Sequence, residues 1–441
     1  MAKRRYNTIF RQLRDKIRNR EARLGVIGLG YVGLPLAVEM AKAGLVVYGI
    51  DVDARKVRSI NRGVSYVQDV PSELLADLVK ARKLKATTDY RILRKCDVID
   101  ICVPTPLRKT KDPDISYIIA AVEHIQTHLH KGQLIILEST TYPGTTEEVI
   151  LPRLEQTGLK VGRDFFLAFS PERVDPGNKQ YTTSTIPKVV GGITKQCTRI
   201  ACELYKTCIV KVVPVSSSTV AEMVKLLENT FRSVNIGLVN EMCLMCDRMN
   251  IDVWEVIEAA GTKPFGFLKH YPGPGLGGHC IPIDPFYLSW KAKMAGFEPR
   301  FIELAGQINS SMPDYVVSKI NDALNEARKS VKASRVLVLG AAYKRDVSDT
   351  RESPALDIMR ILLEKGARVS YADPHVPSVQ IDGKRMRRIA LNPRVLRTHD
   401  CVVIVTDHSA FDYDMIVKHS RRIVDTRNAL KKYRSSKIRR I

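Results

Sequence analysis

Short apolar runs alternate with longer amphipathic stretches over the first 213 residues of the chain. Apolar runs of this length predict strands that are buried on both faces, and the stretches between them predict helices. The runs are LGVIG (24–28), LVVYGID (45–51), VIDICV (98–103) and QLIILES (133–139), with DFFLAFS (164–170) and KVVGGI (188–193) as further candidates. We therefore expect a parallel sheet covered by helices.

A different pattern begins at residue 214. Residues 214–251 contain no internal glycine or proline cluster, and their apolar positions recur at helical spacing. This segment predicts one long helix with Ser217 or Ser218 as its N-cap. A second α/β block follows, with strands in SRVLVLGAAY (334–343), ARVSYADP (367–374) and CVVIVTD (401–407) and a helix around 354–365.

Gly28, Gly30 and Gly33 form GxGxxG between the first apolar run and a predicted helix, and Asp51 ends the next run. The first glycine permits a tight turn, the second lets the backbone approach a pyrophosphate, and the third lets the helix pack on the strand. A carboxylate at position 51 would bind the ribose hydroxyls and repel a 2′-phosphate, which favours NAD over NADP. The fold class we predict is α/β, with two Rossmann-like, doubly wound parallel-sheet domains joined by a long central helix.

These changes of pattern divide the chain, whose 441 residues exceed what one core usually organises. We expect a basic N-terminal extension (1–22) and a dinucleotide-binding domain (23–213). A central helical domain (214–325) carries the long helix. A second sheet domain (326–427) precedes a basic C-terminal tail (428–441).

The charge of the chain is concentrated at its ends. Residues 1–23 carry a net charge of +7 and residues 421–441 carry +8, out of a total of +23. The remaining charge suits an enzyme that handles anionic ligands and requires no nucleic-acid groove. We expect solvated helices or arms at the ends, although Ile9, Leu13 and Ile17 have the helical spacing of a segment that docks.

The expected location is the cytoplasm. No apolar run approaches the length of a membrane span, and the basic N-terminus lacks the apolar core of a secretory signal. The nine cysteines are scattered, which predicts reduced thiols. Cys243 and Cys246 form a CxxC inside the long helix with no completing ligands nearby, so we expect packing there and no metal site.

The stretch YPGPGLGGHCIPIDP (271–285) surrounds Cys280 with glycine and proline, which cannot sustain a helix. A loop cysteine in a nicotinamide enzyme can add to an aldehyde, and the adduct can lose a hydride to give a thioester that water hydrolyses. His279 is a weaker candidate for activating that thiol. On the long helix, Lys225 and Asn229 share a face, and oxidising an alcohol needs a proton acceptor and oxyanion donors. Spacing alone equally fits an exposed surface pair.

Seven ordered motifs carry a resemblance to a known family. They are GLGYVG (28–33), VPTP (103–106), STTYPGTT (139–146), SPERVDPGN (170–178), VKLLENTFR (224–232), GGHCIPIDP (277–285) and AYKRDVSDTRESP (342–354). Over residues 23–427 the chain resembles the nucleotide-sugar 6-dehydrogenases, the UDP-glucose/GDP-mannose dehydrogenase family. The resemblance implies two successive NAD-dependent oxidations of a sugar C6 hydroxymethyl, a UDP-binding third domain, and a homodimer or higher oligomer built on the long helix.

The resemblance also implies roles for individual residues. Cys280 matches the nucleophile, Lys225 the group at the alcohol proton and oxyanion, and Glu172 the glutamate of thioester hydrolysis. Asn229, Asp284 and Thr140 match the oxyanion and water network. Matches to cofactor contacts are Gly28, Gly30, Tyr31, Val32, Gly33, Asp51, Lys56, Thr105, Thr140 and Arg351. Matches to UDP-sugar contacts are Arg173, Val174, Lys225, Asn229, Arg232, Gly277, Tyr343 and Lys344.

The sugar is less well defined. The region around PGPGLGGHC resembles the members that act on UDP-N-acetylglucosamine. An HxR pair that is usual in the UDP-N-acetylmannosamine members is absent upstream of PGPG. UDP-N-acetylmannosamine and UDP-glucose stay as alternatives. Two other hypotheses are a one-step hydroxyacid dehydrogenase, for which Lys225 and Asn229 would suffice, and an NAD-sensing or nucleic-acid-binding protein, which the basic ends would suit.

Overall fold

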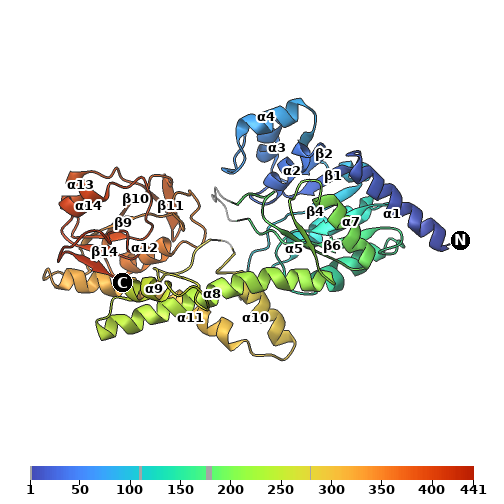
Figure 1. Ribbon diagram of the computed structural model, residues 1–441. Helices are drawn as coiled ribbons and strands as arrows, with labels where there is room; N and C mark the ends of the chain where they lie inside the picture. Colours follow the sequence, from blue (N-terminus) through green and yellow to red (C-terminus); the bar gives the residue numbers. More distant parts are fainter. Residues whose placement is uncertain (1, 109–111, 175–180, 279) are drawn as a thin grey trace. The chain divides into compact units, whose positions relative to one another are not determined.

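The computed structural model describes residues 2–108, 112–174, 181–278 and 280–441 (Figure 1). The chain forms two compact units, Met1–Glu228 and Asn229–Ile441. The predicted long helix is α8, Ser218–Met249, and the boundary between the units falls within it. Ser217 accepts a hydrogen bond from the Val220 amide through Oγ at 3.2 Å, as an N-cap does.

The first unit is built on an eight-stranded sheet with the order β3-β2-β1-β4-β5-β6-β7-β8. All its strand pairs are parallel except β6 with β7. The strands are β1 (Arg23–Ile27), β2 (Val46–Ile50), β3 (Leu84–Thr87), β4 (Val98–Ile101), β5 (Leu134–Leu137), β6 (Phe166–Phe169), β7 (Lys188–Gly192) and β8 (Val212–Pro214). The strand order reverses at β1, which creates a switch point of the kind at which α/β sheets bind ligands.

Helices cover both faces of this sheet, as its continuous apolar runs predicted. In β5, Leu134 and Ile136 pack in a core with α1, α2 and α7, whereas Ile135 and Leu137 pack in a second core with α5. The helices are α1 (Ala2–Arg18), α2 (Gly33–Lys42), α3 (Ala54–Asn61), α4 (Ser72–Lys80), η1 (Tyr90–Lys95), α5 (Ser116–His128), η2 (Thr145–Ile150), α6 (Leu151–Glu155) and α7 (Lys195–Tyr205).

The basic N-terminal segment is a folded part of the first unit. Leu13 and Ile17 of α1 are buried together with Phe10 in the core that α7 shares. Arg18 forms an ion pair with Glu203 of α7 at 2.7 Å. The helical spacing of the apolar residues therefore predicted correctly that this helix docks on the first unit. The basic composition of the segment had instead suggested a solvated arm.

The second unit contains a five-stranded parallel sheet with the order β10-β9-β13-β14-β15. Its strands are β9 (Arg335–Leu339), β10 (Arg368–Ala372), β13 (Cys401–Ile404), β14 (Ile423–Asp425) and β15 (Ile438–Arg440), and β11 (Ser378–Ile381) and β12 (Lys384–Arg387) form a separate antiparallel pair. The helices after α8 are α9 (Val253–Ala260), α10 (Asp284–Met294), α11 (Arg300–Asn325), α12 (Pro354–Glu364), α13 (Pro393–Thr398) and α14 (Tyr413–His419). Cys243 and Cys246 of α8 are buried in the hydrophobic core of the second unit, where they act as packing residues.

The last residues differ from the basic tail that we expected at 428–441. Strand β15 pairs with β14, Ile441 is buried, and the indole Nε1 of Trp254 donates to the Ile441 carbonyl at 3.0 Å. The physical reason is that backbone pairing and the buried Ile441 hold this segment, although most of its side chains are basic. Residues 438–441 thus complete the second sheet.

Candidate functional site

The GxGxxG turn connects β1 to α2 and has a distinct structural reason for each glycine. Gly28 has a φ of +90°, and a Cβ there would lie 2.5 Å from the Cys102 carbonyl oxygen. At Gly33 a Cβ would overlap the carbonyl of Gly28, so the close approach of helix and turn requires glycine. At Gly30, by contrast, no atom of the described residues lies within 4 Å of a Cβ position, apart from Gly30 itself and its two chain neighbours. This open space beside the N-terminus of α2 fits a pyrophosphate, so these residues fit a dinucleotide.

Asp51 lies at the carboxyl end of β2, next to this turn. Its carboxylate is buried and accepts hydrogen bonds from the amides of Leu29 and Asp53, each at 2.9 Å. Lys56 forms an ion pair with the same carboxylate at 3.1 Å. The predicted ribose acceptor is therefore fixed against the glycine turn, with Lys56 beside it.

Thr105 and Thr140 follow β4 and β5, whose carboxyl ends lie on the same edge of the sheet as the glycine turn. Thr105 is buried and Thr140 is half-buried. The hydroxyl of Ser139 donates to the carbonyl of Val103 at 2.8 Å, which ties the two segments together. Tyr31, in the turn, has 48% of its surface exposed.

Glu172 and Lys225, which are 53 residues apart, are brought together in the first unit. The Lys225 ammonium donates to the Glu172 carbonyl at 2.6 Å. The Glu172 carboxylate accepts from the amides of Arg173 and Val174 at 2.6 and 2.7 Å. Arg173 is bound through its guanidinium to Glu228 of α8 at 2.5 Å. The segment that contains the predicted hydrolytic carboxylate is thus attached to the long helix at two points.

A buried charge cluster lies behind Glu172. Lys188 of β7 forms an ion pair with Glu138 at 2.7 Å and lies 3.9 Å from the Glu172 carboxylate. The Tyr205 hydroxyl donates to Glu138 and, at 3.5 Å, to Asp100. Burial, followed by the neighbouring Glu138, raises the pKa of Asp100 well above its usual range. Burial would lower the pKa of Lys188, but Glu138 and Glu172 outweigh it and raise this pKa, so Lys188 stays charged.

Lys225 and Asn229 are both buried, with 8% and 6% of their surfaces exposed. The alternative of an exposed surface pair is therefore wrong, because the fold covers this face of α8. In the second unit, the Asn229 amide donates to Asp284 at 2.5 Å. Asp284 begins α10 and is itself buried. These two members of the predicted water network thus lie in direct contact.

The glycine loop brings Cys280 to the start of α10. Cys280 is an exposed residue with a reduced side chain, and its carbonyl accepts from the Asp284 amide at 2.8 Å. A Cβ at Gly277 would lie 2.6 Å from the Tyr343 Cβ, and one at Gly278 would lie 2.8 Å from the Tyr343 ring. The glycines therefore let this loop pack directly on the segment of Tyr343. His279 lies outside the described residues.

Buried amides hold the other end of the loop. Asn240 of α8 accepts from the Gly273 amide at 3.0 Å and donates to Asn309 of α11 at 2.9 Å. Asn309 in turn donates to the Ser233 carbonyl at 3.0 Å. These contacts join the start of the loop to both long helices of the second unit, and no local sequence pattern predicted them.

The predicted substrate residues of the second unit occupy different settings. Tyr343 and Lys344 lie in the loop after β9, and the Tyr343 amide donates to the Asp349 carbonyl at 3.0 Å. Arg351 forms an ion pair with Asp349 at 2.6 Å, and its carbonyl accepts from the Gly278 amide. Arg232, on α8, is exposed.

Three domains of one protein family match successive parts of the chain. Residues 22–209 match the NAD binding domain of the UDP-glucose/GDP-mannose dehydrogenase family, residues 219–311 its central domain, and residues 337–432 its UDP binding domain. The chain belongs to this family. Membership confirms the resemblance that the seven motifs suggested, and its NAD binding domain contains the GxGxxG turn. The UDP binding domain contains Tyr343 and Lys344.

Individual family members are similar over most of their length. The UDP-N-acetyl-D-glucosamine 6-dehydrogenase of Pseudomonas aeruginosa is 38% identical over 397 residues, which cover 89% of this chain and 92% of the relative. The UDP-N-acetyl-D-mannosamine dehydrogenase of Pyrococcus horikoshii is 36% identical over 93% of this chain and 96% of the relative. A solved UDP-D-ManNAc dehydrogenase from Pyrococcus horikoshii superposes with a TM-score of 0.88 at 36% identity, covering 95% of this chain and 99% of that one.

Another solved member, a UDP-glucose dehydrogenase from Pyrobaculum islandicum, superposes with a TM-score of 0.83 at 27% identity. It covers 95% of this chain and 96% of its own. These likenesses confirm the predicted α/β class with two Rossmann-like domains. Within the described residues, no helix combines the length and the hydropathy needed to cross a membrane.

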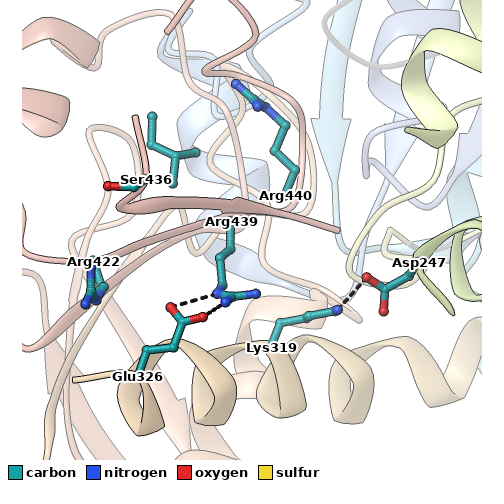
Figure 2. Close-up of a pocket in the computed structure, with 8 residues that line it drawn as sticks. Asp247, Lys319, Glu326, Arg422, Ser436, Arg439 and Arg440 are labelled. Atoms are coloured by element: carbon teal, nitrogen blue, oxygen red, sulfur yellow. Dashed lines mark hydrogen bonds and ion pairs between the residues drawn. The ribbon is translucent and has the colours of Figure 1, made fainter. Parts of the chain in front are cut away.

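A cavity of about 630 Å³ lies elsewhere in the second unit, lined by α11, β15 and the end of α8 (Figure 2). Its charges are largely paired internally, because Glu326 binds Arg439 and Asp247 binds Lys319. None of the predicted catalytic residues lines it. We therefore do not place the family's chemistry in this cavity.

Glu222 of α8 is another functional candidate that the sequence did not reveal. Its buried carboxylate accepts from the amides of Gly144 and Thr146 at 2.6 and 2.9 Å, and from the Thr146 hydroxyl at 2.7 Å. Burial raises its pKa to about 7, against the effect of these donors. Glu222 thereby attaches the loop after Thr140 to the helix that carries Lys225.

Proposed function

We propose that the chain oxidises the C6 hydroxymethyl of UDP-N-acetyl-D-glucosamine to a carboxylate in two steps, with NAD as the hydride acceptor. The observation that carries the proposal is the exposed residue Cys280 in its glycine loop, in a family member with an NAD binding and a UDP binding domain. Bound NAD would accept one hydride from C6 at each oxidation. The roles of the individual residues follow from the family's motifs.

Lys225 and Asn229 serve the first oxidation. As the hydride departs, the alcohol proton passes to a water molecule of the network that Asn229 and Asp284 bind. The buried Lys225 ammonium and the adjacent amide stabilise the oxyanion that develops. Burial of both side chains supports this role, because an electrostatic contact is stronger where water is excluded. Asp284, bound to Asn229, orients the amide.

Cys280 serves the second oxidation. Its thiolate adds to the aldehyde carbon to form a thiohemiacetal, and loss of a hydride from that carbon leaves a thioester. Water then attacks the thioester, Glu172 takes a proton from the water, and the C–S bond breaks to release the acid and the thiolate. The two amides that bind one oxygen of Glu172 support its role as a fixed carboxylate.

The choice of sugar rests on the sequence around PGPGLGGHC and on the absence of the HxR pair. The named relatives divide between UDP-N-acetyl-D-glucosamine and UDP-N-acetyl-D-mannosamine, at 38% and 36% identity. UDP-N-acetyl-D-mannosamine is therefore the second candidate, supported by the TM-score of 0.88 to a structure of that name.

A substrate panel tests the proposal. Initial rates of NADH formation with UDP-N-acetylglucosamine, UDP-N-acetylmannosamine and UDP-glucose give kcat/KM for each. We expect the first to exceed the others by about tenfold or more. A larger kcat/KM for UDP-N-acetylmannosamine would show that the proposed substrate is wrong and that the proposed reaction is right. If no UDP-sugar gives NADH, the proposed reaction itself is wrong.

We also propose a homodimer that uses α8, in the cytoplasm. Leu227, Phe231 and Leu238 share one side of this helix and are 59%, 47% and 55% exposed, which is unusual for large apolar side chains. Multi-angle light scattering should give twice the mass of the chain. A monomer at micromolar concentration would contradict this proposal.

A further inference from the structure

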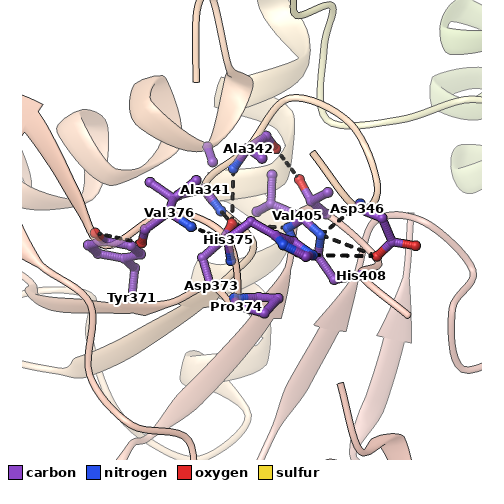
Figure 3. A network of polar contacts seen from close by, with 12 residues as sticks. Ala341, Ala342, Asp346, Tyr371, Asp373, Pro374, His375, Val376, Val405 and His408 are labelled. Atoms are coloured by element: carbon purple, nitrogen blue, oxygen red, sulfur yellow. Dashed lines mark hydrogen bonds and ion pairs between the residues drawn. The ribbon is translucent and has the colours of Figure 1, made fainter. Parts of the chain in front are cut away.

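The loop after β9, residues 341–346, is held at its first end by a buried aspartate (Figure 3). Asp373 follows β10, and its Oδ2 accepts from the amides of Ala341 and Ala342 at 2.7 and 3.1 Å. The other carboxylate oxygen accepts from the amides of His375 and Val376. Burial opposes ionisation of Asp373, but the hydrogen bonds from His408 and from the Ala341 and Ala342 amides outweigh it and lower its pKa to about 2. Asp373 is therefore an anion that anchors the loop.

His408 holds the second end of the loop. Its side chain is fully buried, with Nε2 at 3.0 Å from Asp373 Oδ2 and Nδ1 accepting from the Asp346 amide at 2.9 Å. Because Nδ1 accepts a hydrogen bond, Nε2 carries the proton and donates to Asp373. Ser409 adds a bond from its hydroxyl to the Asp346 carboxylate at 2.7 Å. One imidazole thus connects both ends of the segment that carries Tyr343 and Lys344.

The same neighbourhood has the composition of a metal site. Ligand atoms of Asp346, His375 and His408 lie within 4.8 Å of one another. However, both nitrogens of His408 are already used, one by an amide donor and one by a carboxylate. A metal at Nδ1 would have to displace the Asp346 amide. The contacts therefore favour a hydrogen-bonded clamp, in which His408 and Asp373 hold the loop 341–346.

A comparison with the first unit shows how specific this arrangement is. Asp51 occupies the equivalent place there, after the strand that neighbours the first strand of its sheet, and accepts from a single amide of the turn, Leu29. Asp373 occupies the place after β10, but its oxygens are taken by four amides and an imidazole. Asp373 is therefore committed to the loop and has no capacity left for a ribose.

We propose that His408 and Asp373 are positioning residues that fix the loop 341–346 in the geometry needed to bind the UDP-sugar. This inference rests on the proposed function, because it takes Tyr343 and Lys344 as substrate contacts. His408 acts through the loop and touches no reacting atom. Its removal should weaken nucleotide-sugar binding and leave the chemical steps intact.

Two variants separate the halves of the clamp. His408→Gln can keep the donor to Asp373, and His408→Asn can keep an acceptor for the Asp346 amide. Ser409→Ala removes one tether from an exposed position and remains available if a buried variant unfolds. His375→Asn is the matched control, since its imidazole lies 5.0 Å from that of His408 but 3.8 Å from Asp346, beyond hydrogen-bonding distance.

We expect both His408 variants to raise KM for the UDP-sugar roughly tenfold, because each loses a buried hydrogen bond. Their kcat and KM for NAD should stay within about twofold, a split that a general loss of structure would not produce. Ser409→Ala should raise the same KM a few-fold, and His375→Asn should leave it unchanged. If all variants keep the wild-type KM, or if KM for NAD and kcat change with it, the proposal is wrong.

Two further measurements separate the alternatives. If dialysis against a chelator raises the KM of the wild-type protein and Zn²⁺ restores it, the cluster is a metal site and the clamp is overturned. If the wild-type protein forms no NADH with UDP-sugars, the proposed function fails, and calorimetric titration with UDP then decides about the clamp. Weaker UDP binding by the His408 variants would support it, and equal binding would refute it.

Discussion

Gly278→Ala should disturb the loop that presents Cys280 in two separable ways. Gly278 has a φ of +87°, so an alanine there costs about 1 kcal/mol of backbone strain. Its Cβ would also lie 2.8 Å from Cε2 and 3.0 Å from Cζ of Tyr343, closer than these atoms can approach. Relief of such overpacking typically costs about 1–3 kcal/mol. The sum is about 2–4 kcal/mol, or roughly 5–15 °C in the midpoint of the second unit.

Gly266→Ala provides the matched control. Gly266 has a φ of +71°, and apart from its own atoms and its two chain neighbours no atom of the described residues lies within 4 Å of a Cβ there. Only the strain of about 1 kcal/mol should therefore remain. Thermal unfolding followed by circular dichroism measures both variants, and NADH formation reports the displacement of Cys280. We expect Gly278→Ala to lose most of its activity and Gly266→Ala to keep it.

A double variant tests the contact itself. In a protein that carries Tyr343→Ala, the ring is gone, so Gly278→Ala should cost about 1–3 kcal/mol less than it does in the wild type. If Gly278→Ala lowers the free energy of unfolding equally in the two backgrounds, the absence of a side chain at position 278 is not what lets the loop pack on Tyr343. An equal loss of stability in Gly266→Ala and Gly278→Ala would refute it as well.

The remaining predictions concern the first unit. The folded-state pKa of Glu222, about 7 against 4.5 for an ordinary glutamate, means that its contribution to stability is present below pH 4.5 and lost as the pH rises through 7. Denaturant unfolding from pH 5 to pH 8 should therefore show a fall of roughly 3 kcal/mol or less that is absent in Glu222→Gln. Glu172→Gln should form the thioester but hydrolyse it slowly, so intact-mass measurement after mixing with substrate and NAD should show a sugar nucleotide attached to Cys280; an unmodified mass would count against the hydrolytic role. Asp51→Ser should raise KM for NAD about tenfold or more and lower the ratio of kcat/KM for NAD to kcat/KM for NADP, both measured by initial rates. An unchanged ratio would show that Asp51 does not bind the cofactor.

The sequence predicted the features that local patterns determine. Continuous apolar runs such as LIIL in β5 are buried on both faces because helices cover a parallel sheet, and the spacing of Leu13 and Ile17 predicted that α1 docks. GxGxxG was readable because its three glycines lie within one turn, where Gly28 and Gly33 leave no room for a Cβ and Gly30 leaves space for a ligand. The extent of α8 followed from the same periodicity.

Contacts between distant segments could not be predicted in this way. Glu222 binds Gly144 across 78 residues, and Asn240 binds Asn309 across 69, with no pattern to connect them. An aspartate that follows a strand could accept hydrogen bonds from a ribose or from the backbone amides of a loop. Only the observed contacts of Asp373 show that it binds the loop. The basic composition of the last residues led us to predict a solvated tail. The burial of Ile441 in the core shows that this segment is folded.

We propose that one thiol carries the sugar through its second oxidation. The most direct test is the number of NADH molecules formed per UDP-sugar when the sugar is limiting and NAD is in excess. We expect two NADH per UDP-sugar for the wild-type protein. A value of one, with an aldehyde as the product, would contradict it.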